Sequence, residues 1–180
     1  MSKTLTITGF TLIETLVAIL ILSVAIVGPL TIASRGLGAA LVAKDQTIAF
    51  YLAQDAVEYV RYKRDSNRLA GLADSLSGLD GSNGCTSANG CTIDAIADIA
   101  AACGATCSAI NYNAANFYFS YTSGTQSIFT RKVTIVTPVC ALGGTPCNPD
   151  ESSIISFITW KDVGGALHTV SVRENLLNWQ

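Results

Sequence analysis

The chain has few ionisable residues, and this scarcity excludes several classes of function. Only 13% of its 180 residues are charged, the net charge is -2, and no basic stripe interleaves with aromatic residues, so we expect no nucleic-acid partner. The one histidine, His168, has no nucleophile in a matching motif, which is typical of a surface or packing residue. No glycine-rich phosphate loop follows a strand. We therefore expect no enzyme activity, no catalytic residue and no cofactor.

Charge is nearly absent from residues 10–33, an apolar stretch whose one ionisable residue is Glu14. As a helix, this stretch has the length needed to cross a hydrocarbon core of roughly 30 Å. A charged residue deep in a membrane span costs on the order of 3 kcal/mol, so such a residue usually faces a partner and not lipid. The sequence therefore predicts one membrane-spanning helix in which the Glu14 carboxylate has a partner.

The run GFTLIE at residues 9–14 opens this stretch, after a short and mostly polar leader, residues 1–9. It resembles the class III signal of type IV pilins and type II secretion pseudopilins, in which a prepilin peptidase cuts after glycine and methylates the following phenylalanine. The resemblance implies cleavage between Gly9 and Phe10, N-methylation of Phe10, and an assembly helix over residues 10–34. It also implies that Glu14 pairs with the Phe10 amine of a neighbouring subunit.

The same resemblance implies partners and a location. Basic residues flank the apolar stretch on both sides and leave its orientation open, whereas the family places the leader in the cytoplasm and exports the rest. The expected partners are other pilin subunits, the prepilin peptidase, an inner-membrane assembly platform and the membrane itself. The subunit would begin as a single-pass protein of the cytoplasmic membrane, with an extracytoplasmic C-terminal domain, and then join an extracellular or periplasmic filament.

Other interpretations of the apolar stretch stay open. An ordinary anchor or uncleaved signal anchor needs neither Gly9 nor Glu14. A conventional signal peptide cut near residues 38–40 would have an apolar core far longer than the usual core of about 7 to 15 residues. Within the family, a minor pseudopilin of type II secretion is the alternative to a pilus subunit. From another class, the chain could be a membrane-anchored extracytoplasmic binding or hydrolytic domain.

Gly28 and Pro29 lie inside the apolar stretch. Proline removes a helical hydrogen bond and clashes with the preceding turn, at a cost of about 3 kcal/mol in a helix interior. We therefore expect the helix to kink or loosen at this point. A weak point that lets the helix bend in a filament and a tolerated transmembrane proline both fit this pattern.

Residues 35–71 continue the helix in amphipathic form. Its charged residues crowd the C-terminal end, where Glu58 can pair with Arg61, and a solvated helix end is favoured over a specific docking site. Gly71 is the expected C-cap. Apolar residues at spacings of three, four or seven predict the face that docks on a globular domain, namely Leu37, Leu41, Ile48, Leu52, Ala56 and Tyr59 or Val60.

Residues 72–116 are rich in small and polar residues, and we expect loops with one short helix over residues 92–102. Six cysteines in an exported, loop-rich region favour disulfides over a metal site, because only one cysteine pair has the short spacing of zinc ligands. Six cysteines allow 15 connectivities, so pairing between neighbours is a hypothesis. The neighbouring pairs are Cys85 with Cys91, Cys103 with Cys107, and Cys140 with Cys147.

Residues 117–180 change to alternating apolar and polar residues, typical of strands. Strands are expected at residues 117–121, 128–136, 153–160 and 166–172, with a hairpin turn at Gly164-Gly165. Short connections predict an antiparallel meander. The C-terminal residues resemble the end of minor pilins and minor pseudopilins, which favours a minor subunit. The expected fold is α+β, with a long N-terminal helix, transmembrane in its first half, packed on a four-stranded antiparallel sheet.

Overall fold

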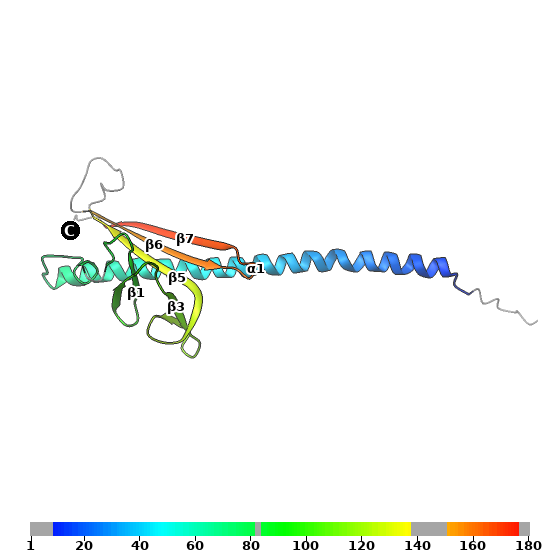
Figure 1. Ribbon diagram of the computed structural model, residues 1–180, viewed down its shortest axis with the longest axis horizontal. Coiled ribbons are helices and arrows are strands. Elements are labelled where there is room, and N and C mark those ends of the chain that lie inside the picture. The colour runs from blue at the N-terminus through cyan, green and yellow to red at the C-terminus, as the bar shows by residue number, and fades with distance from the viewer. Residues whose placement is uncertain (1–8, 82–83, 138–150, 177–180) are drawn as a thin grey trace, which may run out of the picture. The chain divides into compact units, whose positions relative to one another are not determined.

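The computed structural model describes residues 9–81, 84–137 and 151–176. The chain divides into two compact units, Met1–Lys44 and Asp45–Gln180. One helix, α1 (Leu12–Leu69), contributes to both units, and all the strands lie in the second (Figure 1). The fold is α+β, as predicted.

Helix α1 ends where the sequence predicts. The Gly71 N–H donates to the Arg68 carbonyl at 2.9 Å, and the Leu72 N–H donates to the Asn67 carbonyl at 3.0 Å. Gly71 has φ +71°, a left-handed conformation that glycine adopts without a steric penalty. This pair of bonds is the Schellman motif, so the predicted C-cap at Gly71 is confirmed.

The apolar face of α1 is buried only in its second half. Ile48 is half-buried, and further along the helix Leu52, Ala56, Tyr59 and Val60 are buried, with Ala49, Ala53 and Val57 beside them. Leu37 and Leu41 carry the same spacing but are exposed, at 65% and 42%. Spacing predicts a common helical face, but burial also requires a sheet opposite that face.

The sheet has seven strands, not the four that the alternating pattern predicts. All pairings are antiparallel, and the central strand β5 pairs with β6 along one edge and with β3 and β1 along the other. The order is β2-β1-β5-β3-β4, and β6 carries β7 on its far edge. The strands are β1 (Cys91–Asp94), β2 (Ile99–Ala102), β3 (Ala109–Asn113), β4 (Tyr118–Ser120), β5 (Thr125–Val136), β6 (Ser152–Lys161) and β7 (Leu167–Leu176).

Three of these strands lie in the segment expected to be loops, and the helix predicted over residues 92–102 is wrong. That segment forms the hairpin of β1 and β2. Three alanines of this segment lie in β2, while all four residues of β1 are buried against the core. The Asp94 carboxylate accepts the N–H groups of Ile96 and Ala97 at 3.1 and 3.0 Å, which turns the chain back after only four strand residues.

The expected four-stranded meander is correct only for β5, β6 and β7. Residues 117–121 contain β4, which pairs with β3 at the end of the sheet and not with β5. The β6–β7 turn is confirmed: the Gly165 N–H donates to the Asp162 carbonyl at 2.9 Å, and Gly165 has φ +83°.

Two clusters of buried side chains join α1 to the sheet. In one, Val60 packs with Ile93 and Val133; in the other, Leu52 packs with Phe129 and Trp160. Each fully buried aliphatic or aromatic side chain contributes about 1.5–3 kcal/mol. The second half of α1 is therefore a core element of the C-terminal unit.

Candidate functional site

The candidate site is the N-terminal part of α1 together with the residues just before it, where the sequence analysis singled out Gly9, Phe10 and Glu14. The Thr11 carbonyl accepts the N–H groups of Glu14 and Thr15 at 3.1 and 3.2 Å, and the Thr11 hydroxyl lies 3.4 Å from the Glu14 nitrogen. Thr11 is thus the N-cap, and Glu14 occupies the third helical position. A carboxylate there favours the helix, because it lies at the positive end of the helix dipole.

Glu14 is exposed, and its carboxylate has no hydrogen-bond or ion-pair partner among the described residues. The other hydroxyl groups along this part of the helix are satisfied internally. Thr15, Ser23, Thr31 and Ser34 each donate to a carbonyl one turn back, at 2.7–2.9 Å. These side chains are therefore compatible with apolar surroundings, whereas the Glu14 carboxylate has no such partner within the described residues.

The surface around Glu14 is apolar and uncovered. Phe10 is 79% exposed, and every described residue up to Leu41 is exposed. By length and composition, α1 is able to cross a membrane. Such an uncovered surface is unusual for a soluble protein and marks a site for lipid or for other helices.

The structure places Gly9, Phe10 and Glu14 together at the start of α1, and Gly28 and Pro29 in its interior. A Cβ atom added at Gly9 or Gly28 would meet no atom within 4 Å, so neither glycine is required by packing inside the chain. The helix continues on both sides of Pro29. A kink there stays a prediction.

Charged residues at the C-terminal end of α1 contact the sheet. Arg61 pairs with Glu58 at 3.0 Å, as predicted, and also with Glu174 of β7 at 2.7 Å. The Lys63 amine lies 2.8 Å from Asp98 in the β1–β2 turn. The solvated helix end favoured by the sequence pattern is therefore wrong in part, because these charges also fix the helix to the domain.

Asp98 links this contact to the core. It accepts the Tyr59 hydroxyl at 3.0 Å, while its hydrogen bond with Lys63 lowers the pKa of the Asp98 carboxyl. Burial of Tyr59, together with the nearby Asp98 charge, raises the pKa of the Tyr59 hydroxyl well above its ordinary value. Both shifts favour the protonation states that form these hydrogen bonds near neutral pH.

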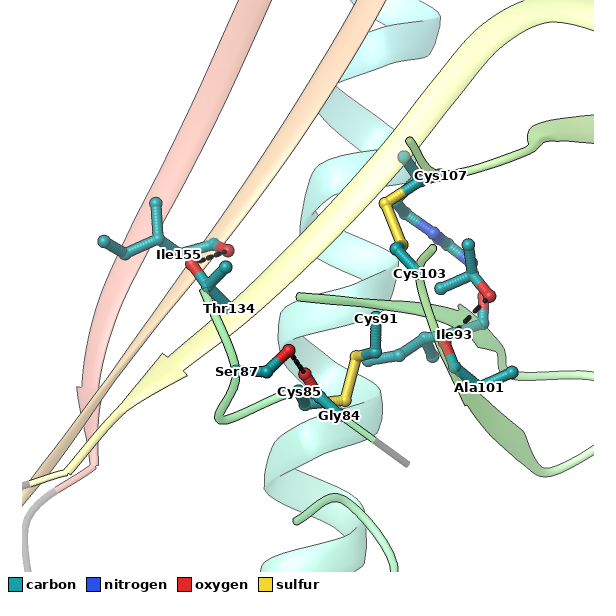
Figure 2. Close-up of a disulfide and its surroundings, with 12 residues drawn as sticks. Gly84, Cys85, Ser87, Cys91, Ile93, Ala101, Cys103, Cys107, Thr134 and Ile155 are labelled. Atoms are coloured by element: carbon teal, nitrogen blue, oxygen red, sulfur yellow. Dashed lines mark hydrogen bonds between the residues drawn. A yellow bond between two sulfur atoms is a disulfide. The ribbon is translucent and has the colours of Figure 1, made fainter. Parts of the chain in front are cut away.

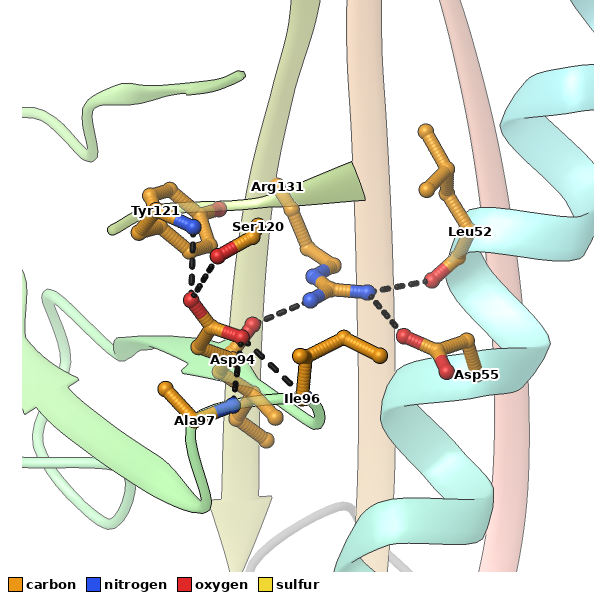
Figure 3. A network of polar contacts seen from close by, with 9 residues as sticks. Leu52, Asp55, Asp94, Ile96, Ala97, Ser120, Tyr121 and Arg131 are labelled. Carbon is orange, nitrogen blue, oxygen red and sulfur yellow. Dashed lines mark hydrogen bonds and ion pairs between the residues drawn. The ribbon is translucent and has the colours of Figure 1, made fainter. Parts of the chain in front are cut away.

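A buried arginine, which the sequence pattern did not single out, connects α1 to β1 and β5 (Figure 3). The Arg131 side chain is 1% exposed. It donates to the Leu52 carbonyl at 2.9 Å, to the Asp55 carboxylate at 2.8 Å and to the Ile93 carbonyl. The inward direction of the Arg131 side chain was predictable from the sequence, since strand alternation places Arg131 on the same face as the buried Phe129 and Val133.

Asp94 completes the polar network in Figure 3 from the other side. It accepts the Ser120 hydroxyl at 2.6 Å and the Tyr121 N–H at 2.7 Å, in addition to the two N–H groups of its own turn. Burial opposes ionisation of Asp94, but these four hydrogen bonds outweigh it and lower the pKa of the Asp94 carboxyl. These four hydrogen bonds hold the β1–β2 turn against β4 and the residue that follows it.

Two of the three expected disulfides are present, Cys85–Cys91 and Cys103–Cys107 (Figure 2). Cys85 and Cys91 are fully buried beside β1, where the Cys85 carbonyl accepts the Ile135 N–H at 2.7 Å. Cys140 and Cys147 lie outside the described residues. Within the described part of the chain, no group of three or more His, Cys, Asp or Glu residues is placed to hold a metal ion.

His168 packs on the indole ring of Trp160, with ring centroids 5.3 Å apart, and its Nε2 lies 2.9 Å from Asp162. These contacts give His168 the packing role that its position in a strand suggests.

Comparisons with known protein families, curated proteins and solved structures found no match to this chain.

Proposed function

We propose that the protein is a structural subunit, most simply a minor one, of a type IV pilus-like filament, and that it works by assembly and not by catalysis. One observation carries the proposal. The Glu14 carboxylate stands without an intramolecular partner among the described residues, on an exposed apolar helix and five residues after Gly9 in the GFTLIE pattern. In a lone anchor this carboxylate would serve only the start of the helix, whereas in a filament of helices it can also pair with a neighbouring subunit.

In the proposed mechanism, a prepilin peptidase cuts between Gly9 and Phe10 on the cytoplasmic face and methylates the new Phe10 amine. The helix holds the subunit in the membrane until an assembly platform moves it into a filament. There, Glu14 of the incoming subunit pairs with the Phe10 amine of a neighbour. Because desolvation offsets much of the attraction in such a pair, its main effect is to set the stagger between subunits.

Two further observations support this proposal. The remaining hydroxyl groups of the apolar segment are satisfied by their own helix, so Glu14 is the polar group that specifies position. The disulfides support an exported C-terminal unit, since disulfides persist in oxidising compartments.

The N-terminus of the mature chain tests the proposal. The full-length protein should be expressed in a cell with a prepilin peptidase, extracted from membranes and analysed by intact-mass and N-terminal peptide mass spectrometry. We expect a chain that begins at N-methylated Phe10. Substitution of Gly9 with a bulky residue should leave the leader in place, and Gly28→Ala is the matched control, because both glycines have free space around them.

An intact Met1 on membrane-extracted wild-type protein would overturn the proposal. That result would favour a membrane-anchored binding or hydrolytic domain. Cleavage near residues 38–40 would identify a conventional signal peptide instead.

A further inference from the structure

A groove of ≈ 440 Å³ lies on the face of the sheet opposite α1. Thr130 and Lys132 of β5 contribute to its floor, and Thr159 and Phe157 of β6 stand directly beside them in the strand register. These positions alternate with the buried residues that face α1. The groove is therefore separate from the helix surface proposed for assembly.

A disulfide-closed loop forms one wall of the groove. The Cys103–Cys107 bridge closes a loop of five residues, and both Thr106 and Cys107 line the groove. Figure 2 shows this bridge beside β5. Asn89, from the loop that precedes β1, completes the lining on the polar side. Because the bridge restricts the loop, this wall is held in place without a ligand.

Four polar side chains in the groove have no hydrogen-bond partner within the described residues. Among the described residues, no hydrogen bond engages the side-chain amide of Asn89 or the hydroxyl groups of Thr106, Thr130 and Thr159. Hydroxyl groups elsewhere in the domain are engaged: Ser127, for example, donates to the Ile110 carbonyl at 2.6 Å. The groove thus gathers hydrogen-bonding groups that are available to a ligand.

The aromatic and charged residues of the lining limit the chemical class of ligand that the groove can bind. The half-buried Phe157 ring forms no ring stack with another described aromatic residue, and no carboxylate lines the groove. Lys132 is the one cation in the lining, and its amine already donates to the Ala88 carbonyl at 2.9 Å. A single lysine is too little charge for a nucleic acid, whose binding depends on several phosphate contacts.

An added peptide strand is also a poor fit. Strand addition needs a free sheet edge, yet the floor of the groove lies in mid-sheet. There β5 pairs with β6 and β3, and β6 pairs with β5 and β7. The ligand must therefore use side-chain hydrogen bonds and one aromatic surface.

We propose that this groove binds a neutral pyranose sugar, one residue of an extracellular glycan. A pyranose ring has an apolar C–H face for Phe157 and hydroxyl groups around its rim for the amide and hydroxyls of the groove. The volume suits a ligand of this size, and the mixture of an aromatic surface with a few placed polar groups is typical of small-molecule sites. This binding goes beyond the proposed assembly role and does not depend on it.

Saturation-transfer NMR tests the proposal with the full-length protein in micelles of a detergent that has no sugar headgroup. The probes are the methyl glycosides of glucose, galactose and N-acetylglucosamine in the millimolar range, and sorbitol is the control polyol without a ring. We expect saturation of the ring protons of at least one glycoside and none of sorbitol. Phe157→Leu should weaken binding about three- to tenfold, through loss of the aromatic surface.

Two matched substitutions locate the site. Thr159→Val removes a groove hydroxyl at constant shape and should weaken binding about three- to tenfold. Thr169→Val makes the same change on β7, directly opposite Thr159 in the register and outside the groove lining, and should leave binding unchanged.

Absence of saturation for all three glycosides would overturn the proposal, as would saturation of sorbitol to the same extent. Equal effects of Thr159→Val and Thr169→Val would also overturn it, because binding would then lie elsewhere. None of these results bears on cleavage after Gly9, so the two proposals fail independently.

Discussion

Replacement of Glu14 is the perturbation that separates an assembly role from a local role in the helix. Thr11 and Glu14 have the spacing of a capping box, so part of any effect could come from the start of the helix itself. Four substitutions separate the two contributions. Glu14→Ala removes carboxylate and cap, Glu14→Gln keeps a side chain able to cap but removes the charge, Glu14→Asp keeps the charge, and Thr11→Val removes only the N-cap hydroxyl.

The structure sets the size of each effect. Inside the chain, loss of the Glu14 charge costs about 0.3–1 kcal/mol of helix stability. Neither cluster of the C-terminal unit involves a residue before Ile48, so the stability of that unit should not change. In the membrane, removal of the carboxylate favours insertion by up to about 3 kcal/mol.

Assembly should respond much more strongly. Removal of one member of a buried charge pair leaves the other without compensation, at a cost of about 3–5 kcal/mol. At about 1.4 kcal/mol for each factor of ten, incorporation into filaments should fall by roughly a hundredfold or more in Glu14→Ala and Glu14→Gln. Thr11→Val should lower it by about tenfold at most, since an N-cap contributes about 1 kcal/mol.

The assay is the fraction of mature chain recovered in filaments sheared from cells, relative to the mature chain left in the membrane. Processing is measured on the same samples, so a defect in cleavage is not mistaken for a defect in assembly. Wild-type incorporation of processed Glu14→Gln would refute the charge pairing and assign Glu14 to the helix cap. Failure of Glu14→Ala to reach the membrane would refute it at an earlier step, since Glu14 would then serve export.

Three further predictions concern the C-terminal unit. Arg131→Met should lower the free energy of unfolding by about 2–4 kcal/mol in guanidinium titrations, because buried carbonyl acceptors lose their donor. Asp55→Asn should cost less than about 1 kcal/mol, because the Asp55 carboxylate is half-exposed. Equal losses would show that the ion pair, and not the carbonyl contacts, stabilises the fold. The lowered pKa of Asp94 contributes stability that is complete above its unfolded pKa of about 4 and is lost as the pH falls through the lower folded value. Asp94→Asn should therefore flatten the acid side of the plot of unfolding free energy against pH. An unchanged plot would contradict the stabilising role of the Asp94 hydrogen bonds. Thiol labelling of the denatured, unreduced protein should leave the cysteines of the Cys103–Cys107 bridge unmodified, and full labelling would contradict the disulfides.

Local sequence by itself determined most of the helical part of this protein. The apolar run and the C-cap at Gly71 are local features, so the sequence pattern locates them, whereas the N-cap at Thr11 came from the structure. The pattern that singles out Gly9, Phe10 and Glu14 is likewise contiguous. Most of strands β5, β6 and β7 was also predictable, because these are long strands whose alternation covers much of their length.

Tertiary structure decided what depends on contacts between distant segments. Strand β1 has only four residues, which is too short a run for its alternation to be recognised, and its pairing with β2 depends on the turn that Asp94 caps. The burial of Arg131 requires a carbonyl of α1 and another of β1 to meet beside β5, and the groove requires the Cys103–Cys107 loop to stand over β5 and β6. The spacing of apolar residues in the sequence specifies which residues share a face of a helix or strand. Only the register of the sheet and the docking of the helix specify which residues pack against that face.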